Sequence, residues 1–237
     1  MTKPFQFKLF QIQQDRCAMK IGTDGVLLGA WTSIGHQPQS ILDIGAGTGL
    51  IALMLAQRSN ADTIDALEIN EEAHGQCVDN FESSDWADRL FCYHASLDEF
   101  VDELDDKYDL IVSNPPFYSE IVSSGDENRD MARQNQSLPF TELLGGAAQL
   151  MSKDGTFSTI IPYKEELTFL KMAHELNLFP KRITRVKGNP ESEVKRSLIE
   201  FQFGNISVTV NNLTIELERH KYTQEYIDLT KDFYLKM

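Results

Sequence analysis

The stretch LDIGAGTGLIALMLAQR, residues 42–58, joins a short apolar run to a helix-like segment through three glycines. The apolar run is typical of a buried strand, and the residues that follow it repeat apolar side chains at helical spacing. Glycines in such a turn leave room where a Cβ would block a ligand, and the turn aims helix N-terminal amides at a bound group. The stretch therefore predicts a strand, a tight turn and a helix of an α/β sheet, with a ligand at the turn.

The spacing of the glycines limits which cofactors the turn is expected to bind. Gly45, Gly47 and Gly49 alternate with other residues, so they form neither the G-x-G-x-x-G turn of dinucleotide folds nor a phosphate-binding G-K-[ST] loop. Glu68 ends the next strand-like run, 19 residues after Gly49, where an acid can accept ribose hydroxyls. Asp43 adds negative charge that suits a cationic ligand and repels a pyrophosphate. These residues predict a site for S-adenosylmethionine, which carries a sulfonium, an ammonium and a ribose.

Strand-like and helix-like segments alternate outward from this turn, over residues 40–113. Such alternation predicts a parallel, doubly wound sheet. Thr23 or Asp24 is expected to cap an earlier helix within GTDGVLLGAW, and Asn70, followed by two acids, is expected to cap a later one. The last three strand-like runs are expected to be antiparallel and to close the sheet, and they cover residues 182–188, 196–203 and 206–217.

The fold class that follows is α/β, with a Rossmann-like, mostly parallel sheet of seven strands in a single domain. The expected parts are a short strand-and-helix extension at 1–38, a catalytic core at 39–203, and C-terminal strands and a helix at 204–237.

Composition excludes several other classes of protein. The chain has 237 residues, of which 41% are apolar, so it is long enough for one sizeable core. Its longest apolar stretch, LIALMLA, is too short for a membrane span or a signal peptide, and a cytoplasmic protein is expected. The three cysteines, Cys17, Cys77 and Cys92, lack metal-ligand spacing and are expected to pack in the core, with neither a disulfide nor a metal site.

The net charge of −14 is unevenly distributed along the chain. Residues 62–109 contain 16 acids and 2 bases, and the remaining residues contain 20 of each. Residues 181–196 carry six Lys or Arg against two Glu. A basic face can therefore coexist with an acidic back, although a run of this kind is as often a solvated surface.

A second motif, SNPPFYSE at residues 113–120, follows the strand-like run YDLIV. Its prolines fix φ and cannot continue a strand or a helix, so the turn presents backbone and side-chain acceptors at the carboxyl edge of the sheet. The exocyclic amine of a purine is a poor nucleophile because its lone pair is delocalised into the ring. Two hydrogen bonds, from the amine to the Asn114 side-chain oxygen and to the Pro115 carbonyl, would hold it for methyl transfer.

The rest of the turn supports the same interpretation. Pro116 completes the rigid bend, and Phe117 offers a flat apolar surface on which an extruded base can stack. The motif alone leaves three acceptors open: an adenine amine, a guanine N2 in RNA, and the side-chain amide of a glutamine in a protein release factor.

Four segments together resemble a known family. They are CAMKIGTDGVLLGAW at 17–31, LDIGAGTGLIALMLAQR at 42–58, SNPPFY at 113–118 and YTQEYIDLTKDFYLKM at 222–237. With them the chain resembles the bacterial tRNA1(Val) (adenine-37-N6)-methyltransferase family of class I S-adenosylmethionine-dependent enzymes. The resemblance covers nearly the whole chain, and its first and last segments are the most specific to this family.

The resemblance implies N6-methylation of the adenine 3′ of the anticodon in a valine-accepting tRNA, by an enzyme we expect to be a monomer. Thr23 and Asp24 would close over the methionine end of the cofactor. Ser96 stands where relatives often have an acid that binds the cofactor adenine, and this contact would be weaker or would pass to Asp98 or backbone amides. Basic residues would bind tRNA phosphates, and they are Arg129, Arg133, Lys181, Arg182, Arg185, Lys187, Lys195 and Arg196.

Overall fold

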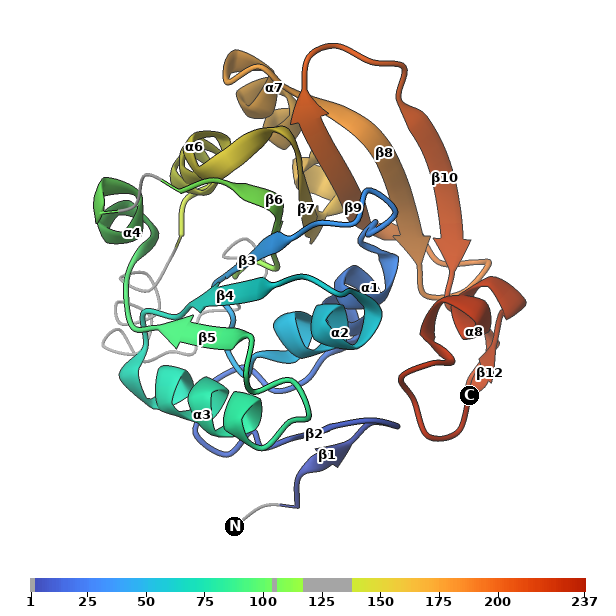
Figure 1. The fold of residues 1–237 in the computed structure, drawn as a ribbon. Helices are drawn as coiled ribbons and strands as arrows, with labels where there is room; N and C mark the ends of the chain where they lie inside the picture. The colour runs from blue at the N-terminus through green and yellow to red at the C-terminus, as the bar shows by residue number, and fades with distance from the viewer. Residues whose placement is uncertain (1–2, 104–105, 117–137) are drawn as a thin grey trace, which may run out of the picture.

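The computed structural model describes residues 3–103, 106–116 and 138–237, and its centre is a twisted sheet of eight strands (Figure 1). The strand order is β10-β8-β9-β7-β6-β3-β4-β5. In chain order these strands are β3 (Ser40–Ile44), β4 (Thr63–Leu67), β5 (Leu90–Tyr93), β6 (Tyr108–Ser113), β7 (Met151–Pro162), β8 (Leu178–Lys187), β9 (Val194–Phe203) and β10 (Thr209–Thr214). The pairs from β5 to β7 are all parallel, as the alternation of segments predicts.

Helices cover both faces of the sheet, so the expected doubly wound architecture is confirmed (Figure 1). One face carries α1 (Thr23–Trp31), α2 (Leu50–Arg58), α3 (Glu71–Glu82) and, beside β10, α8 (Gln224–Thr230). The other face carries α4 (Leu97–Glu103), α6 (Phe140–Leu150) and α7 (Glu166–Glu175), which follows the short 3-10 helix η2 (Tyr163–Glu165). No helix in the described part of the chain is long and apolar enough to cross a membrane.

The far edge of the sheet differs from the expectation. The strand β9 is antiparallel to both β7 and β8, as predicted. The strand β10 is parallel to β8, so the prediction that it is antiparallel to its partner is wrong, and it adds an eighth strand to the seven expected. The chain does reverse after β9, at Gly204 with φ +81°. Both edges of β9 are already paired, however, and the returning strand can pair only with the outer edge of β8.

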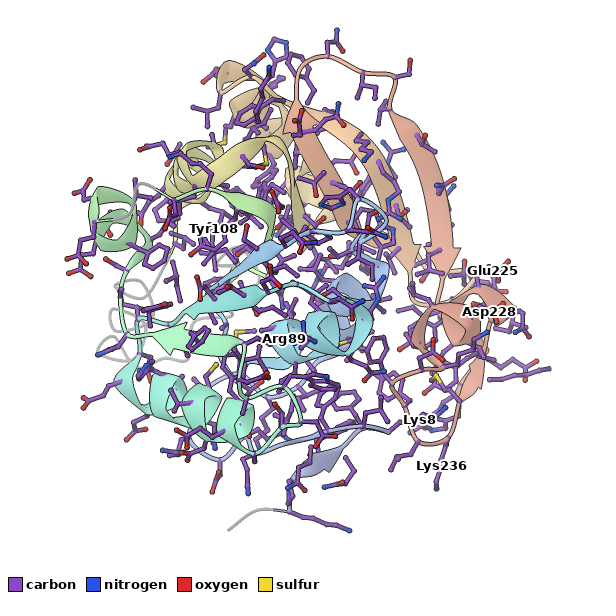
Figure 2. The ribbon with its side chains drawn as sticks, viewed as in Figure 1. Lys8, Arg89, Tyr108, Glu225, Asp228 and Lys236 are labelled. Carbon is purple, nitrogen blue, oxygen red and sulfur yellow. The ribbon has the colours of Figure 1, made fainter. Side chains whose placement is uncertain are left out.

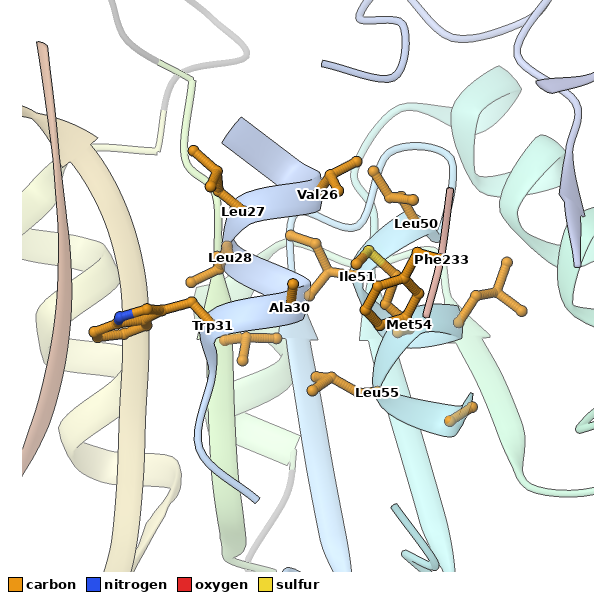
Figure 3. Packing of buried hydrophobic residues seen from close by; sticks show 14 of the residues in the cluster. Val26, Leu27, Leu28, Ala30, Trp31, Leu50, Ile51, Met54, Leu55 and Phe233 are labelled. Carbon is orange, nitrogen blue, oxygen red and sulfur yellow. The ribbon is translucent and has the colours of Figure 1, made fainter. Parts of the chain in front are cut away.

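The helix α1 packs against α2 at short range (Figure 3). A Cβ on Gly29 would lie 2.7 Å from the Sδ atom of Met54, so only glycine permits this approach. The N-cap of α1 is Gly22 and makes no side-chain hydrogen bond, so the prediction that Thr23 or Asp24 caps this helix is wrong. The cap of α3 is as expected, since the Asn70 side chain accepts a hydrogen bond from the Ala73 amide at 3.0 Å.

The two ends of the chain meet on the α1 and α2 side of the molecule. The N-terminal hairpin joins β1 (Phe5–Gln6) to β2 (Gln11–Ile12), and Phe7 forms an isolated bridge with Tyr234. Lys8 Nζ donates to the Lys231 and Met237 carbonyls, and Figure 2 shows Lys8 beside the C-terminal segment. The small hairpin of β11 (Glu216–Glu218) and β12 (Lys221–Tyr222) precedes α8, which is the helix expected within residues 204–237.

Candidate active site at the carboxyl edge of the sheet

Three neighbouring parallel strands end at the same level of the sheet. Ile44 of β3 is in register with Leu67 of β4 on one side and with Ser113 of β6 on the other. The segments that follow these strands are therefore brought together at one edge, and they include the glycine turn, Glu68 and the proline pair. Open α/β sheets bind their ligands at this edge.

The glycine turn has the backbone conformation that its sequence predicts. Gly45, Gly47 and Gly49 have φ values of +76°, +55° and +78°, which other residues rarely adopt. A Cβ on Gly45 or Gly47 would meet nothing within 4 Å, so the space above both residues is open to a ligand. A Cβ on Gly49 would lie 2.5 Å from Phe81, so this third glycine serves the packing of α3.

Glu68 ties the glycine turn to the start of α3. Its Oε2 accepts a hydrogen bond from the Gly47 amide at 2.8 Å, and its Oε1 accepts one from the Asn70 amide at 2.8 Å. A carboxylate has about four lone-pair sites, so two backbone amides leave capacity for further donors such as a pair of hydroxyls. Glu68 is half-buried at the edge, where a ligand can reach it.

Asp43 lies beneath the turn, fully buried, and caps α2 from the neighbouring strand. Its Oδ2 accepts a hydrogen bond from the Ala52 amide at 3.1 Å, a role that Gly49 at the N-cap position cannot fill with a side chain. Its Oδ1 is buried and has no hydrogen-bond partner in the described structure. Burial, opposed by the Ala52 hydrogen bond and reinforced by the charge of Glu68, raises the pKa of Asp43 to about 7.

Asn114 begins the proline turn directly after β6 ends at Ser113. Its Oδ1 is buried and accepts no hydrogen bond from the described part of the chain, although a buried acceptor of this kind is normally satisfied. Its Nδ2 lies toward α1, 3.9 Å from the position that a Cβ on Gly25 would occupy. Pro115 is buried and Pro116 is half-buried. Phe117, Arg129 and Arg133 lie outside the described residues.

The first turn of α1 reaches the same edge. A Cβ on Gly25 would lie 3.0 Å from Leu50, the first residue of α2, and close to the Asn114 amide, so this turn lies between the two motifs. Thr23 and Asp24 are thereby brought to the site, as the family resemblance implies. Asp24 Oδ2 accepts a hydrogen bond from Arg196 Nε at 2.8 Å.

Ser96 has a structural partner of its own. Its Oγ donates to Glu99 Oε2 at 2.7 Å, and its amide donates to the same oxygen at 3.0 Å. This is a capping box at the start of α4, and it gives a physical reason for serine rather than an acid at this position. Asp98 is exposed, and the hydrogen bond with Ser96 lowers the pKa of its carboxyl.

Most of the basic residues in 181–196 are engaged within the protein. Lys181 and Arg182 pair with Glu200 at 3.6 and 3.1 Å, and the Arg182 guanidinium lies 3.7 Å from the ring centroid of Trp31. Arg185 pairs with Glu166 at 2.7 Å. Both glutamates are almost fully buried, whereas Lys195 is exposed and Lys187 is half-buried.

Three residues at or near this edge of the sheet belong to neither of the sequence motifs, the glycine turn and the proline turn. Ile69 follows β4 and is 52% exposed, and Tyr163 follows β7 and is 40% exposed. Glu166, three residues after Tyr163, holds Arg185 in place. The only signal that could have located them is their position just after a strand, since strand ends point to the edge in a parallel sheet. Among the residues that the structure describes, no group of three or more His, Cys, Asp or Glu is placed to hold a metal ion.

Comparisons with known proteins agree with this geometry. The model of the methyltransferase small domain family matches residues 25–165. The tRNA1(Val) (adenine(37)-N6)-methyltransferase of Christiangramia forsetii is 61% identical, covering 100% of this chain and 99% of that protein. The protein of the same name from Flavobacterium psychrophilum is 62% identical, covering 98% and 100%.

A solved structure supports the fold. The protein described as a "predicted O-methyltransferase" from Agrobacterium tumefaciens superposes with a TM-score of 0.69 at 19% identity, covering 89% of this chain and 96% of that one. At this identity the likeness concerns the fold and not the acceptor.

Proposed function

Because this chain belongs to the methyltransferase small domain family, and within it to the tRNA1(Val) (adenine(37)-N6)-methyltransferases, we propose that it methylates N6 of adenine 37 in a valine-accepting tRNA. The observation that carries the proposal is the buried Asn114 Oδ1, which has no partner among the described residues and lies after the strand next to that of the glycine turn. We further propose that the enzyme acts as a monomer in the cytoplasm, where tRNA is found.

The residues of the turn fit S-adenosylmethionine. This cofactor supplies an electrophilic methyl group on a cationic sulfur. The open space above Gly45 and Gly47 fits a ligand that approaches the backbone closely, and the spare acceptor capacity of Glu68 fits ribose hydroxyls. Gly49 shapes the turn, Thr23 and Asp24 close the methionine end, and Asp43 favours a cation from below because its carboxylate has one unpaired oxygen. The adenine end would contact backbone amides near Ser96, whose side chain is already bound to Glu99.

The proline turn supplies the acceptors for the reacting amine. Asn114 Oδ1 and the Pro115 carbonyl would accept one hydrogen bond each from the exocyclic amine. These bonds favour a pyramidal nitrogen whose lone pair faces the methyl group, so no strong general base is required. Pro116 keeps the turn rigid, and Phe117 would stack on the base. The proton that the amine loses passes to solvent.

The tRNA would contact the half of the edge formed by β7, β8 and β9. The acidic residues of 62–109 lie on the opposite flank, around α3, β5 and α4 (Figure 1). Lys187 and Lys195 are the cations of the 181–196 segment for which the described structure gives no ion pair, so we propose them as phosphate contacts, together with Arg129 and Arg133. A base in the anticodon loop can be extruded cheaply because it is not held in a duplex.

The test is mass spectrometry of nucleosides from tRNA that lacks the modification, after incubation with the enzyme and labelled cofactor. The expected product is N6-methyladenosine at position 37. Methylguanosine would show a guanine-N2 acceptor, and label that stays in protein after ribonuclease treatment would show a glutamine acceptor. Either result would overturn the proposed reaction while leaving the cofactor site intact.

A further inference from the structure

Arg196 lies in a basic segment, but besides the neighbouring Lys195 carbonyl its side chain contacts an acid on another element. Its Nε donates to Asp24 Oδ2 at 2.8 Å, across 172 residues of sequence. The Arg196 side chain is only 19% exposed and that of Asp24 28%. A guanidinium this well covered, with a carboxylate at hydrogen-bond distance, makes a charge-assisted bond that water weakens little.

The Arg196–Asp24 ion pair lies at the carboxyl edge of the sheet, beside the turn of α1 that faces the proposed cofactor site. Arg196 is in register with Pro162 at the end of β7, three residues beyond Thr159, which is level with Ser113. Asp24 is in the first turn of α1, next to Gly25, which separates Leu50 from Asn114. The arginine therefore reaches from β9 to the turn of α1 that faces both motifs.

The first turn of α1 packs against α2 but has few hydrogen bonds that hold its N-terminal end in the described structure. Its N-cap, Gly22, makes no side-chain hydrogen bond, and the bond from the Val26 amide to the Gly22 carbonyl is long, at 3.4 Å. Asp24 accepts no hydrogen bond from any other described residue, so without Arg196 its partly buried carboxylate would lose the cation beside it. An ion pair with the sheet both anchors this turn and balances its charge.

We propose that Arg196 is a positioning residue of the cofactor site and not a tRNA contact. It holds the Asp24 carboxylate and the first turn of α1 beside Asn114, so that Thr23 and Asp24 are in place for the methionine end of the cofactor. This role rests on the proposed function, because it assumes that S-adenosylmethionine binds at the glycine turn. Arg196 would then belong to the cofactor site and not to the RNA-binding surface formed by the rest of the basic segment.

Lys195 provides a matched control. It is adjacent to Arg196 on β9, so its side chain points to the opposite face of the sheet, and it is exposed. Removing the charge of Lys195 or that of Arg196 changes the net charge of this edge of the sheet by the same amount. An effect of Arg196 that Lys195 does not share cannot come from the general electrostatic field.

The experiment measures S-adenosylhomocysteine binding by calorimetry without RNA, and tRNA binding separately at two salt concentrations. Arg196→Gln is expected to weaken cofactor binding about tenfold, the size of a lost hydrogen bond to a charged group, and to leave tRNA affinity and its salt dependence unchanged. Arg196→Lys, which keeps the charge, is expected to recover part of the loss. Lys195→Gln is expected to show the reverse pattern, with weaker tRNA binding and unchanged cofactor binding.

A double-mutant cycle separates positioning from general destabilisation. If Arg196 acts through Asp24, adding Arg196→Gln to Asp24→Asn causes no further loss of cofactor affinity, whereas an independent structural role gives additive losses. Cofactor binding by Arg196→Gln within twofold of wild type, or additive losses in the cycle, would overturn the positioning role alone. Failure of the wild-type protein to bind S-adenosylhomocysteine would overturn the cofactor site of the proposed function, and with it this role.

Discussion

The buried carboxylates of the two halves of the sheet are satisfied in different ways. Beneath the glycine turn, Asp43 has one oxygen on a backbone amide and the other without a partner in the part of the chain that the structure describes. At the β8 and β9 flank, Glu166 and Glu200 are each paired with an arginine, and Glu166 also accepts a hydrogen bond from Ser197. A buried charge normally requires such partners. Among these carboxylates, the one with a spare oxygen lies where we propose a ligand, and the paired ones stabilise the β8 and β9 flank.

Two neutral groups differ in a similar way. Asn114 Oδ1 is buried at the edge and has no partner among the described residues, whereas the Trp31 Nε1 group, buried under the β8 and β9 flank, donates to Thr184 at 2.9 Å. A protein that leaves an acceptor unsatisfied loses stability, and this loss is tolerated where binding recovers it. Substitution of Asn114 should consequently affect turnover, and substitution of Arg185 should affect unfolding.

The largest effect is expected for Asn114→Ala. Loss of one of the two acceptors for the reacting amine should lower turnover about 100- to 1,000-fold, while S-adenosylhomocysteine binding stays within a few-fold of wild type. Single-turnover methylation and calorimetry measure the two quantities. Asn212→Ala, at an exposed position on β10, serves as the control and should change neither. Normal turnover of Asn114→Ala would remove the proposed clamp.

The next effect concerns the stabilising half. Arg185→Ala leaves the Glu166 carboxylate buried without its cation, and it should lower the free energy of unfolding by about 3 kcal/mol, measured by urea denaturation. Lys187→Ala, two residues along the same strand, should change stability by less than about 0.5 kcal/mol. If instead Arg185→Ala unfolds like the wild type and binds tRNA poorly, the division between the two halves fails.

Another effect, on the pH dependence of stability, follows from the raised pKa of Asp43. Because the pKa is about 7 in the folded protein and 3.8 ordinarily, the unfolded chain releases this proton first as pH rises. The contribution of Asp43 to stability is therefore lost between about pH 4 and pH 7, by up to about 1.4 kcal/mol per pH unit. Asp43→Asn should lack this slope, so the difference in unfolding free energy between wild type and variant should change over this pH range. Identical pH dependence in both proteins would show that Asp43 is ionised throughout.

The smallest effect is expected for alanine substitutions at two glycines. They distinguish the cost of backbone strain from a clash with the bound cofactor. Gly45 and Gly204 both have positive φ, +76° and +81°, and a Cβ on either would meet nothing within 4 Å. Alanine at either position should cost about 1 kcal/mol of stability for the left-handed conformation. Only Gly45→Ala should also weaken S-adenosylhomocysteine binding, because its methyl group would enter the cofactor space. Equal binding by both variants would place the cofactor away from the turn.

The fold was largely predictable because its signals are local. The spacing from Gly45 to Gly49, and of Glu68 from them, reflects a repeated geometry of strand, turn and helix, and the structure brings these residues together. The partner of β10 was not predictable in this way, since it depends on which strand edge remains free after β9 has paired on both sides.

The basic segment shows the same limit for the site. Lys and Arg residues are visible in the sequence, but their partners are 18 to 172 residues away, in Glu200, Glu166 and Asp24. Charge density alone cannot tell a cation that binds phosphate from one that neutralises a buried acid. The residues of a motif with fixed spacing meet in the folded protein, so the sequence already shows which of them act together. The partners of a charge cluster depend on the tertiary fold and are not visible in the sequence.

The most direct test of the account is a crystal structure of the protein with S-adenosylhomocysteine. The account predicts the ribose hydroxyls within hydrogen-bond distance of Glu68, the cofactor backbone over Gly45 and Gly47, and the sulfur facing Asn114 Oδ1. A cofactor bound at another edge of the sheet, or an Asn114 side chain turned into the protein with its oxygen satisfied there, would contradict it.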